Sequence, residues 1–269
     1  TENIAYIAGD LLLSLLAWYL FVELLNSRNF FIESSTDFAE KLFRVGALII
    51  PLSWGLLNLL TEQYRDVYRL SRWSVFSQTL LLSVFGSVVL LFVLLADPEI
   101  QFAGRYFSAI TSFFALHFGL TIFFRLVFLT AMSKRLKSGL VGFNTLIIGG
   151  DQSAVKLFRE ITSLHYSLGH KFIGFIHSNG GNGNELIQHL PQLGGLNDIS
   201  RTIEQRNVEE VIIAIESTEH QKLKSILDML FEFGDQLIIR TIPDTYDILL
   251  GTVRLNHLYG AILIEVKQE

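Results

Sequence analysis

The residues best suited to chemistry form a glycine turn at residues 149–154, with the sequence Gly-Gly-Asp-Gln-Ser-Ala. Residues 144–148 before it are a short apolar run rich in branched side chains, as in a buried parallel strand. Because a helical pattern follows, the free N–H groups of a helix N-terminus would lie at this turn, where they could bind a phosphate. The candidate contacts for such an anion are Gly149, Gly150, Gln152 and Ser153.

The turn departs in two respects from a dinucleotide-binding site with its G-x-G-x-x-G pattern. Gly149 and Ala154 suit the first and third positions, but Asp151 at the second would block close backbone approach and repel a pyrophosphate. The acid expected after the second strand, which would bind a ribose hydroxyl, is replaced by His177 and Ser178. Asp151 also suits a helix N-cap, where its carboxylate would bond the free N–H groups. We therefore expect a structural or interaction role for the turn, with a bound nucleotide as the alternative.

The other reactive residue types form no catalytic constellation. The sequence has no cysteine, which excludes disulfides, thiolate metal sites and a cysteine nucleophile. The histidines of the second half lack metal-ligand spacing; they are His165, His170, His177, His189, His220 and His257. No Walker loop, GxSxG elbow or EF-hand loop occurs. We therefore predict no catalytic residue and no metal site in this chain.

Apolar residues dominate the first half of the chain. Half of all residues are hydrophobic, the mean hydropathy is +0.42 and only 17% are charged, which is too apolar for a soluble protein of this length. Apolar runs at residues 4–25, 45–60, 75–96 and 107–131 approach or exceed the roughly 20 residues that cross a bilayer. The sequence thus predicts a four-helix transmembrane domain over residues 1–139, followed by a cytoplasmic domain over residues 140–269.

The segment at residues 61–74, between the second and third runs, carries Arg65, Arg69 and Arg72. Three more basic residues follow the fourth run, whereas the other two connections carry little excess positive charge. By the positive-inside rule, both termini then face the cytoplasm. Tyrosine and tryptophan accompany the arginines, as in a helix lying at the headgroup layer. We interpret the segment as a topology signal and interfacial anchor, with a site for the phosphate of a lipid carrier as the alternative.

Ionisable residues inside the runs are expected to pair. Asp10 in the first run and Arg125 in the fourth lie at similar depths, and Glu23 matches Arg44 in the same way. An unpaired charge at such a depth costs about 2.5–3.5 kcal/mol, so we predict an Asp10–Arg125 ion pair and a Glu23–Arg44 pair. A transport route would bring several polar residues per helix, and these helices are otherwise apolar. We interpret the pairs as contacts between helices, with an ion or proton path as the alternative.

The fourth run carries two further features. His117 lies alone among apolar residues, so we expect it to be packed or interfacial rather than a metal ligand. Thr111, Ala115 and Gly119 form a stripe of small residues at helical spacing. Such a stripe is suited to close packing between membrane helices.

Strand-like and helix-like segments alternate after residue 140. Strand patterns lie at residues 144–148, 172–176, 211–215, 236–242 and 262–266, and helical patterns at 152–165, after Asn197 or Asp198, and at 220–233. This alternation predicts a Rossmann-like α/β domain with a mainly parallel sheet. From Leu140 onward, 16 acidic residues outnumber 10 basic ones, so we expect no nucleic-acid partner.

Taken in order, three features resemble the N-terminal part of the bacterial polyprenyl glycosylphosphotransferases. They are Asp10, the turn at 149–154, and a tail in which Pro243, Asp244, Asp247, Gly251 and Gly260 lead into residues 262–266. That family comprises polytopic sugar-phosphate transferases of the bacterial inner membrane that start exopolysaccharide, capsule or O-antigen repeats. The resemblance covers nearly the whole chain.

The resemblance implies a C-terminal catalytic domain that would follow such a tail and is absent from this chain. That domain uses a carboxylate dyad and Mg²⁺ to move a sugar-1-phosphate from a UDP-sugar onto undecaprenyl phosphate. Because no adjacent Asp-Glu pair occurs here, no catalytic residue is carried over, and Mg²⁺ is expected only in the absent domain. The two predicted domains would anchor, assemble or regulate the enzyme among membrane lipids. We expect a homodimer, because a small α/β domain on a bundle offers unpaired surface.

Three other protein classes stay open. A membrane-bound nucleotide-sugar dehydratase or epimerase would share this N-terminal half and continue past Glu269 with a true G-x-G-x-x-G. A channel or transporter with a nucleotide-sensing domain would carry a selectivity filter, and no TVGYG-like run is present. A membrane scaffold would pair protomers through the α/β domain. Since the chain begins at Thr1 and stops directly after a strand-like run, we expect it to be a piece of a larger polypeptide.

Overall fold

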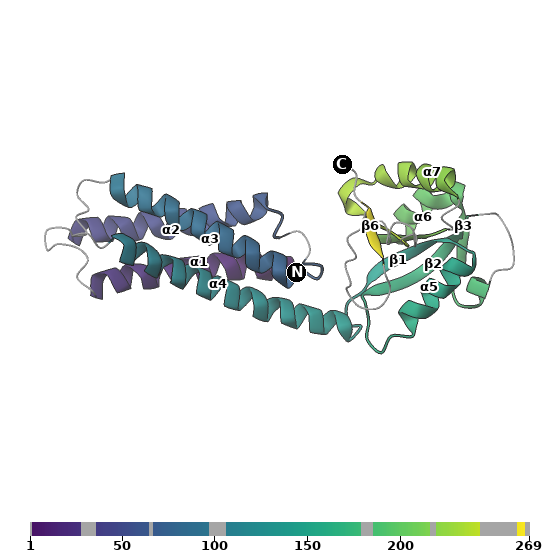
Figure 1. The fold of residues 1–269 in the computed structure, drawn as a ribbon, viewed down its shortest axis with the longest axis horizontal. Helices are drawn as coiled ribbons and strands as arrows, with labels where there is room; N and C mark the ends of the chain where they lie inside the picture. The colour runs from purple at the N-terminus through teal and green to yellow at the C-terminus, as the bar shows by residue number, and fades with distance from the viewer. Residues whose placement is uncertain are drawn as a thin grey trace, which may run out of the picture. The chain divides into compact units, whose positions relative to one another are not determined.

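A computed structural model describes residues 2–27, 36–64, 67–96, 106–178, 185–215, 219–242 and 263–266. The chain divides into two compact units, Thr1–Lys134 and Arg135–Glu269. The first unit is a helical bundle and the second an α/β domain (Figure 1).

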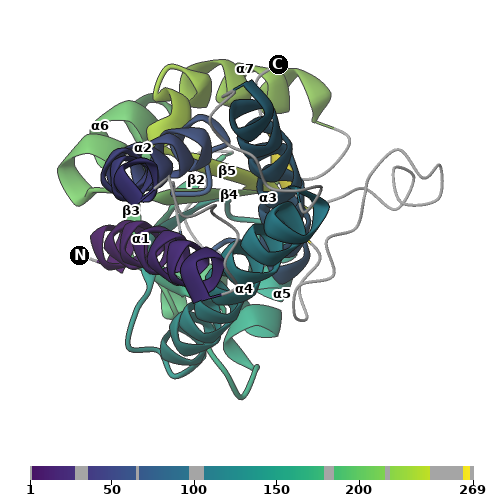
Figure 2. The same cartoon turned by 90° about the vertical axis from the view of Figure 1, so that its left-hand side faces the viewer.

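Long apolar helices build the first unit. They are α1 (Glu2–Ser27), α2 (Thr36–Leu60), α3 (Arg72–Ala96) and α4 (Tyr106–Lys137). All four are long and apolar enough to cross a membrane. Figure 2 views them end-on, arranged around a shared centre. The predicted bundle is therefore confirmed, although α2 begins well before its apolar run and continues through Pro51.

Tryptophans seated on glycines bring the helices together in one half of the bundle. A side chain at Gly46 of α2 would meet the Trp18 ring at 2.1 Å, and one at Gly86 of α3 would meet the Trp54 ring at 1.9 Å. Both rings join a buried apolar cluster that includes Phe21 and Phe113. The glycines are thus required by packing, because each makes room for an aromatic ring from a neighbouring helix.

The small-residue stripe of α4 does not take part in this packing. Thr111, Ala115 and Gly119 are all exposed, and a side chain at Gly119 would meet nothing within 4 Å. The stripe therefore makes no close contact within this bundle, and close packing between helices at this face stays a prediction. The face of α4 that carries His117 and Arg125 turns inward instead, because these polar groups find partners only among the other helices.

The connection between α2 and α3 differs from the expected headgroup-layer helix. Residues 61–64 and 67–69 form turns, and α3 begins at Arg72. Tyr64 and Val67 are buried against the bundle, with Tyr6 and Met132 in the same cluster. Apolar burial thus folds this connection inward. Trp73 remains exposed at the start of α3, as an interfacial anchor requires.

The second unit is built on a six-stranded sheet in the order β3-β2-β1-β4-β5-β6. Its strands are β1 (Phe143–Gly149), β2 (His170–His177), β3 (Gln192–Gly195), β4 (Glu210–Ala214), β5 (Ile238–Thr241) and β6 (Ile264–Val266). Strands β1 to β5 run parallel, and β6 is antiparallel to β5. The predicted α/β fold with a mainly parallel sheet is confirmed. The glycine-containing β3 was absent from the prediction because it has no apolar run.

Helices cover both faces of the sheet (Figure 1). Apolar side chains of α5 (Gln152–Thr162) pack with Ile147 and Ile212 on one face. On the other face, α6 (Ile199–Arg206) and α7 (His220–Phe231) pack with Leu146 and Ile213. The strand order reverses direction between β1 and β4. In sheets of this kind, ligands bind outside the carboxyl ends of the strands at such a reversal.

Candidate functional site

The glycine turn lies at this reversal, at the carboxyl end of β1. Gly149 has a φ of +151°, and a side chain there would meet the carbonyl oxygen of Ala214 in β4 at 2.2 Å. The close approach of the two neighbouring strands therefore requires this glycine, independently of any ligand. Gly150 is buried, Ser153 is half-buried and Gln152 is exposed. The structure thus brings the four candidate contacts to one edge of the sheet.

Asp151 occupies the N-cap position of α5, with an extended backbone. Its carboxylate makes no capping hydrogen bond, so that part of the prediction is wrong. The first turn is closed by the backbone instead, because the Asp151 carbonyl oxygen accepts from the N–H groups of Ala154 at 3.0 Å and Val155 at 3.3 Å. A carboxylate nevertheless stands at the end of the helix where a phosphate would bind.

The residues that follow β2 are buried. His177 and Ser178 are 3% and 6% exposed. The Ser178 hydroxyl oxygen has no hydrogen-bond partner among the described residues. Neither side chain supplies the carboxylate that would hold a ribose hydroxyl, so this end of the sheet carries a buried histidine and a buried serine in place of a nucleotide-binding acid.

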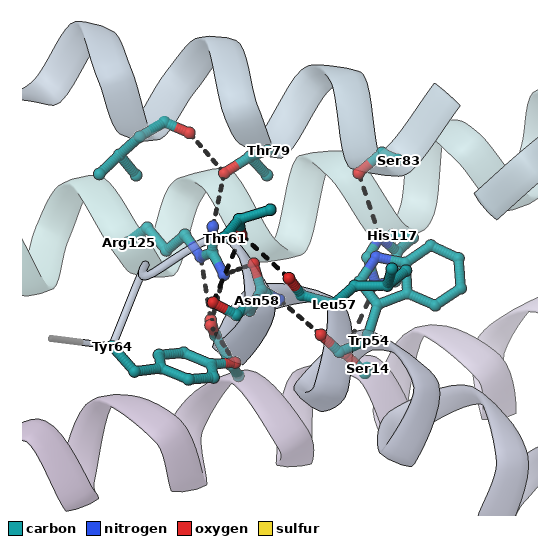
Figure 3. A network of polar contacts seen from close by, with 12 residues as sticks. Ser14, Trp54, Leu57, Asn58, Thr61, Tyr64, Thr79, Ser83, His117 and Arg125 are labelled. Atoms are coloured by element: carbon teal, nitrogen blue, oxygen red, sulfur yellow. Dashed lines mark hydrogen bonds and ion pairs between the residues drawn. The ribbon is translucent and has the colours of Figure 1, made fainter. Parts of the chain in front are cut away.

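The second candidate site lies in the bundle and is centred on Arg125, which Figure 3 shows, and on its partner Asp10. The Arg125 guanidinium donates to both Asp10 carboxylate oxygens, from Nε at 3.2 Å and from Nη2 at 2.6 Å. Both residues are almost fully buried. The structure thus brings together the two residues that were expected to pair because they lie at similar depths in their apolar runs. A two-point pair of this kind is the strongest contact that arginine makes with a carboxylate.

Three further side chains, those of Asn58, Tyr64 and Thr79, surround the pair. Together with Asp10 and Arg125 they form what we term the charge layer. Arg125 also donates to the Asn58 amide oxygen and the Thr79 hydroxyl, each at 2.8 Å. The Tyr64 hydroxyl donates to Asp10 at 3.0 Å. Burial, followed by the nearby Asp10 charge, raises the pKa of Tyr64 well above its ordinary value, so Tyr64 stays a donor at neutral pH. The layer therefore ties all four helices and the α2–α3 connection together.

Ser14, Trp54, Ser83 and His117 form a second polar layer, the histidine layer (Figure 3). The His117 ring nitrogens lie 3.4 Å from the Ser14 hydroxyl and 3.3 Å from the Ser83 hydroxyl. The ring centroids of Trp54 and His117 are 4.3 Å apart. His117 is thus packed, and it belongs to a polar layer.

The view of these helices as otherwise apolar was wrong. Buried polar residues recur at intervals of one helical turn, which places them on one interior column. They are Asp10 and Ser14 on α1, Thr79, Ser83 and Ser87 on α3, and His117, Thr121 and Arg125 on α4. The column could have been predicted from the sequence, because its serine, threonine and histidine residues recur at a spacing of four.

Other predicted contacts of the bundle are placed differently. Glu23 and Arg44 are exposed on α1 and α2, and their pairing stays a prediction. Arg72 is exposed and Arg69 half-buried, whereas Arg65 lies outside the described residues. A site formed by these arginines for a lipid phosphate also stays a prediction.

A buried polar cluster at the amino ends of the strands was not predicted. The Glu210 carboxylate of β4 lies 2.6 Å from Nδ1 of His170 in β2 and 3.0 Å from Nη1 of Arg240 in β5. It also accepts from the Thr145 hydroxyl of β1 at 3.1 Å. The cluster crosses four adjacent strands. Because its members are far apart in the sequence, only the sheet order brings them together.

In the described part of the chain, no group of three or more metal-ligating side chains is present. A family model described as a CoA-binding domain matches residues 63–242, from the connection before α3 to the end of β5. The chain belongs to this CoA-binding domain family. The domain occurs in the N-terminal region of sugar-phosphate transferases and polysaccharide-biosynthesis proteins. No curated protein matches the chain.

The residues at the turn of this CoA-binding domain protein do not fit the diphosphate of coenzyme A. Such a group binds to free N–H groups at the positive end of a helix dipole, and a carboxylate at that end opposes it. The charged residues between Gly149 and Lys156 are Asp151 at the cap and Lys156 itself, which is exposed on α5. The space in which a Gly149 side chain would lie is occupied by the Ala214 carbonyl group, so this glycine is explained by strand packing and does not indicate a ligand. The family description and the chemistry of this turn therefore disagree.

Proposed function

We propose that this chain is the membrane-anchoring and regulatory or assembly portion of a polyprenyl-phosphate sugar-1-phosphate transferase of the bacterial inner membrane. Such an enzyme starts surface polysaccharide synthesis from a UDP-sugar and undecaprenyl phosphate. The observation that carries the proposal is a family match that covers α3 and α4 of the membrane bundle and continues through the α/β domain to the end of β5. A nucleotide-binding domain alone would not require α3 and α4.

Within this proposal, the chain performs no chemistry itself. The UDP-sugar, undecaprenyl phosphate and Mg²⁺ act through a catalytic domain outside this chain. The bundle holds that domain at the membrane, with both termini in the cytoplasm. The α/β domain provides surface for assembly into a homodimer.

The test compares two polypeptides expressed in bacterial membranes: this chain, and the longest product of the same reading frame. Each is assayed with Mg²⁺ for transfer of labelled sugar-1-phosphate from a panel of UDP-sugars to undecaprenyl phosphate. Transfer by the longer product alone is the expected result. A longer product that transfers no sugar-1-phosphate contradicts the proposal. Conversion of the UDP-sugar without lipid would instead indicate a dehydratase or epimerase, and a reading frame that stops at Glu269 would indicate a scaffold.

Coenzyme A is the second candidate ligand, since the family is described by it. We expect no binding at the turn, because Asp151 places negative charge where the diphosphate would lie. Titration calorimetry of the purified chain with coenzyme A, NAD and UDP measures this directly. Binding of coenzyme A that strengthens in Asp151→Asn would place it at this turn and overturn the expectation.

A further inference from the structure

The polar column of the bundle contains more hydrogen-bonding capacity than its side chains satisfy. Among the described residues, the Tyr6 hydroxyl, the Trp54 ring N–H, the Gln63 amide oxygen and the Thr121 hydroxyl are buried without a hydrogen-bond partner. Every one of these residues is more than nine-tenths buried. Buried polar groups are normally bonded to protein or to ordered water. A group left unbonded in a membrane interior costs several kcal/mol.

Three of these unsatisfied groups, those of Tyr6, Trp54 and Thr121, belong to residues one helical turn from members of the two polar layers, and Gln63 directly precedes Tyr64 of the charge layer in the sequence. On α4, Thr121 is one helical turn from both His117 and Arg125. On α1, Tyr6 is one turn from Asp10, and its ring centroid lies 5.7 Å from the Arg125 guanidinium carbon. On α2, Trp54 is one turn from Asn58, and its ring packs against the His117 ring in a tilted arrangement. The unsatisfied groups therefore extend the charge layer and the histidine layer into one continuous column.

We propose that this column binds a short file of water molecules, which link the charge layer to the histidine layer through Thr121. A buried water makes about 2–4 hydrogen bonds and needs that many polar partners. Thr121 can offer its hydroxyl as donor and acceptor, and the serine hydroxyls beside His117 retain lone pairs. Water would thus satisfy groups that no described side chain reaches.

The column is closed at one end by apolar packing. Trp18, Phe21, Leu94 and Phe113 are all nearly fully buried in one cluster. On α1 this cluster follows the column, and on α4 it precedes the column, so it occupies the other half of the bundle. Water in the column consequently has no polar path across the bundle, and the column is a blind hydrated site rather than a channel.

Water-edited solid-state NMR on the full chain in deuterated liposomes measures hydration directly. Transfer of magnetisation from water to His117 and Thr121 should build up several-fold faster than transfer to Phe113 and Phe21. Exposed Lys134 serves as the wet reference. Build-up at His117 and Thr121 as slow as at Phe113 would show a dry column and overturn the proposal.

The Thr121→Val variant provides a second test, because its sign differs between a wet and a dry column. If the hydroxyl binds water, the variant lowers the unfolding midpoint; if the hydroxyl is truly unbonded, the variant raises it. Thr130→Val is the matched control, since Thr130 is exposed on the same helix and its hydroxyl donates to the Leu126 carbonyl oxygen. A raised midpoint for Thr121→Val overturns the proposal. Proton flux into protein-containing liposomes above that of protein-free liposomes would contradict the conclusion that apolar packing closes one end of the column.

Discussion

Arg125 of α4 and Asp10 of α1 are joined by two hydrogen bonds, at 3.2 and 2.6 Å, with both side chains buried. Their charges cancel, and two of the remaining guanidinium N–H groups donate to Asn58 and Thr79. The pair is stable in an apolar bundle only as a complete unit, because either partner alone leaves a buried charge uncompensated.

Removing one member of this pair should therefore be costly. Arg125→Met is expected to lower the free energy of unfolding by about 3–5 kcal/mol. Equilibrium unfolding of the chain in mixed detergent micelles measures the loss. Lys134→Met, an exposed position on the same helix, should change it little. The double variant Asp10→Leu with Arg125→Met should recover part of the loss. Strictly additive losses would show that the two residues act independently.

Glycines that receive tryptophan rings should not tolerate a methyl group. Gly86→Ala would drive a carbon into the Trp54 ring and is expected to cost about 1–3 kcal/mol of stability. Gly119→Ala is the matched control, since open space surrounds that position and alanine favours the helix by up to about 1 kcal/mol. Unfolding midpoints of the two variants should move in opposite directions. A stable Gly86→Ala protein would contradict the packing of Trp54.

Substitution of the glycine at the end of β1 should destabilise the α/β domain. Gly149→Ala combines a φ of +151° with a clash against the Ala214 carbonyl, so a loss of at least about 1–3 kcal/mol is expected. Amide hydrogen exchange of the full chain should then show faster exchange in β1 and β4. Gly195→Ala, which meets nothing within 4 Å, should leave exchange unchanged. Unaltered protection in Gly149→Ala would argue against the close approach of these strands.

Tyr64 should make stability depend on alkaline pH. Its folded pKa is raised above the ordinary 10.0 by burial, so above about pH 10 the unfolded chain loses this proton while the folded chain keeps it. The contribution of Tyr64 is complete below pH 10 and declines as the pH rises further. Tyr64→Phe removes the bond to Asp10 and should give a flatter profile above pH 10. Identical slopes for the two proteins between pH 9 and 11 would contradict this assignment.

The proposed homodimer is tested by mass measurement in detergent. A dimer is expected for the full chain, and a monomeric mass at micromolar concentration would remove assembly from the proposed roles. Gly119 belongs to the exposed stripe of small residues on α4. If the dimer packs through that face, Gly119→Ala should lower the dimeric fraction, because the added methyl group hinders close helix approach.

The sequence contained enough to predict the four helices and the parallel sheet, because long apolar runs and alternating patterns are local signals. Depth along the runs was also enough to match Asp10 with Arg125. The remainder of the polar column on α4 was missed, since the stripe at Gly119 and the column at His117 have the same period and only the partners on α1 and α3 distinguish them. The cluster around Glu210 could not be predicted from the sequence for a different reason, because it depends on which strands become neighbours in the sheet.

That cluster also determines how the sheet can come apart. Glu210 holds groups from β1, β2 and β5 while sitting in β4. If any one of these strands peels away at its amino end, the carboxylate loses a partner while still shielded from water. Fraying from this edge is therefore penalised at the first step, and the four central strands should open together as one cooperative unit.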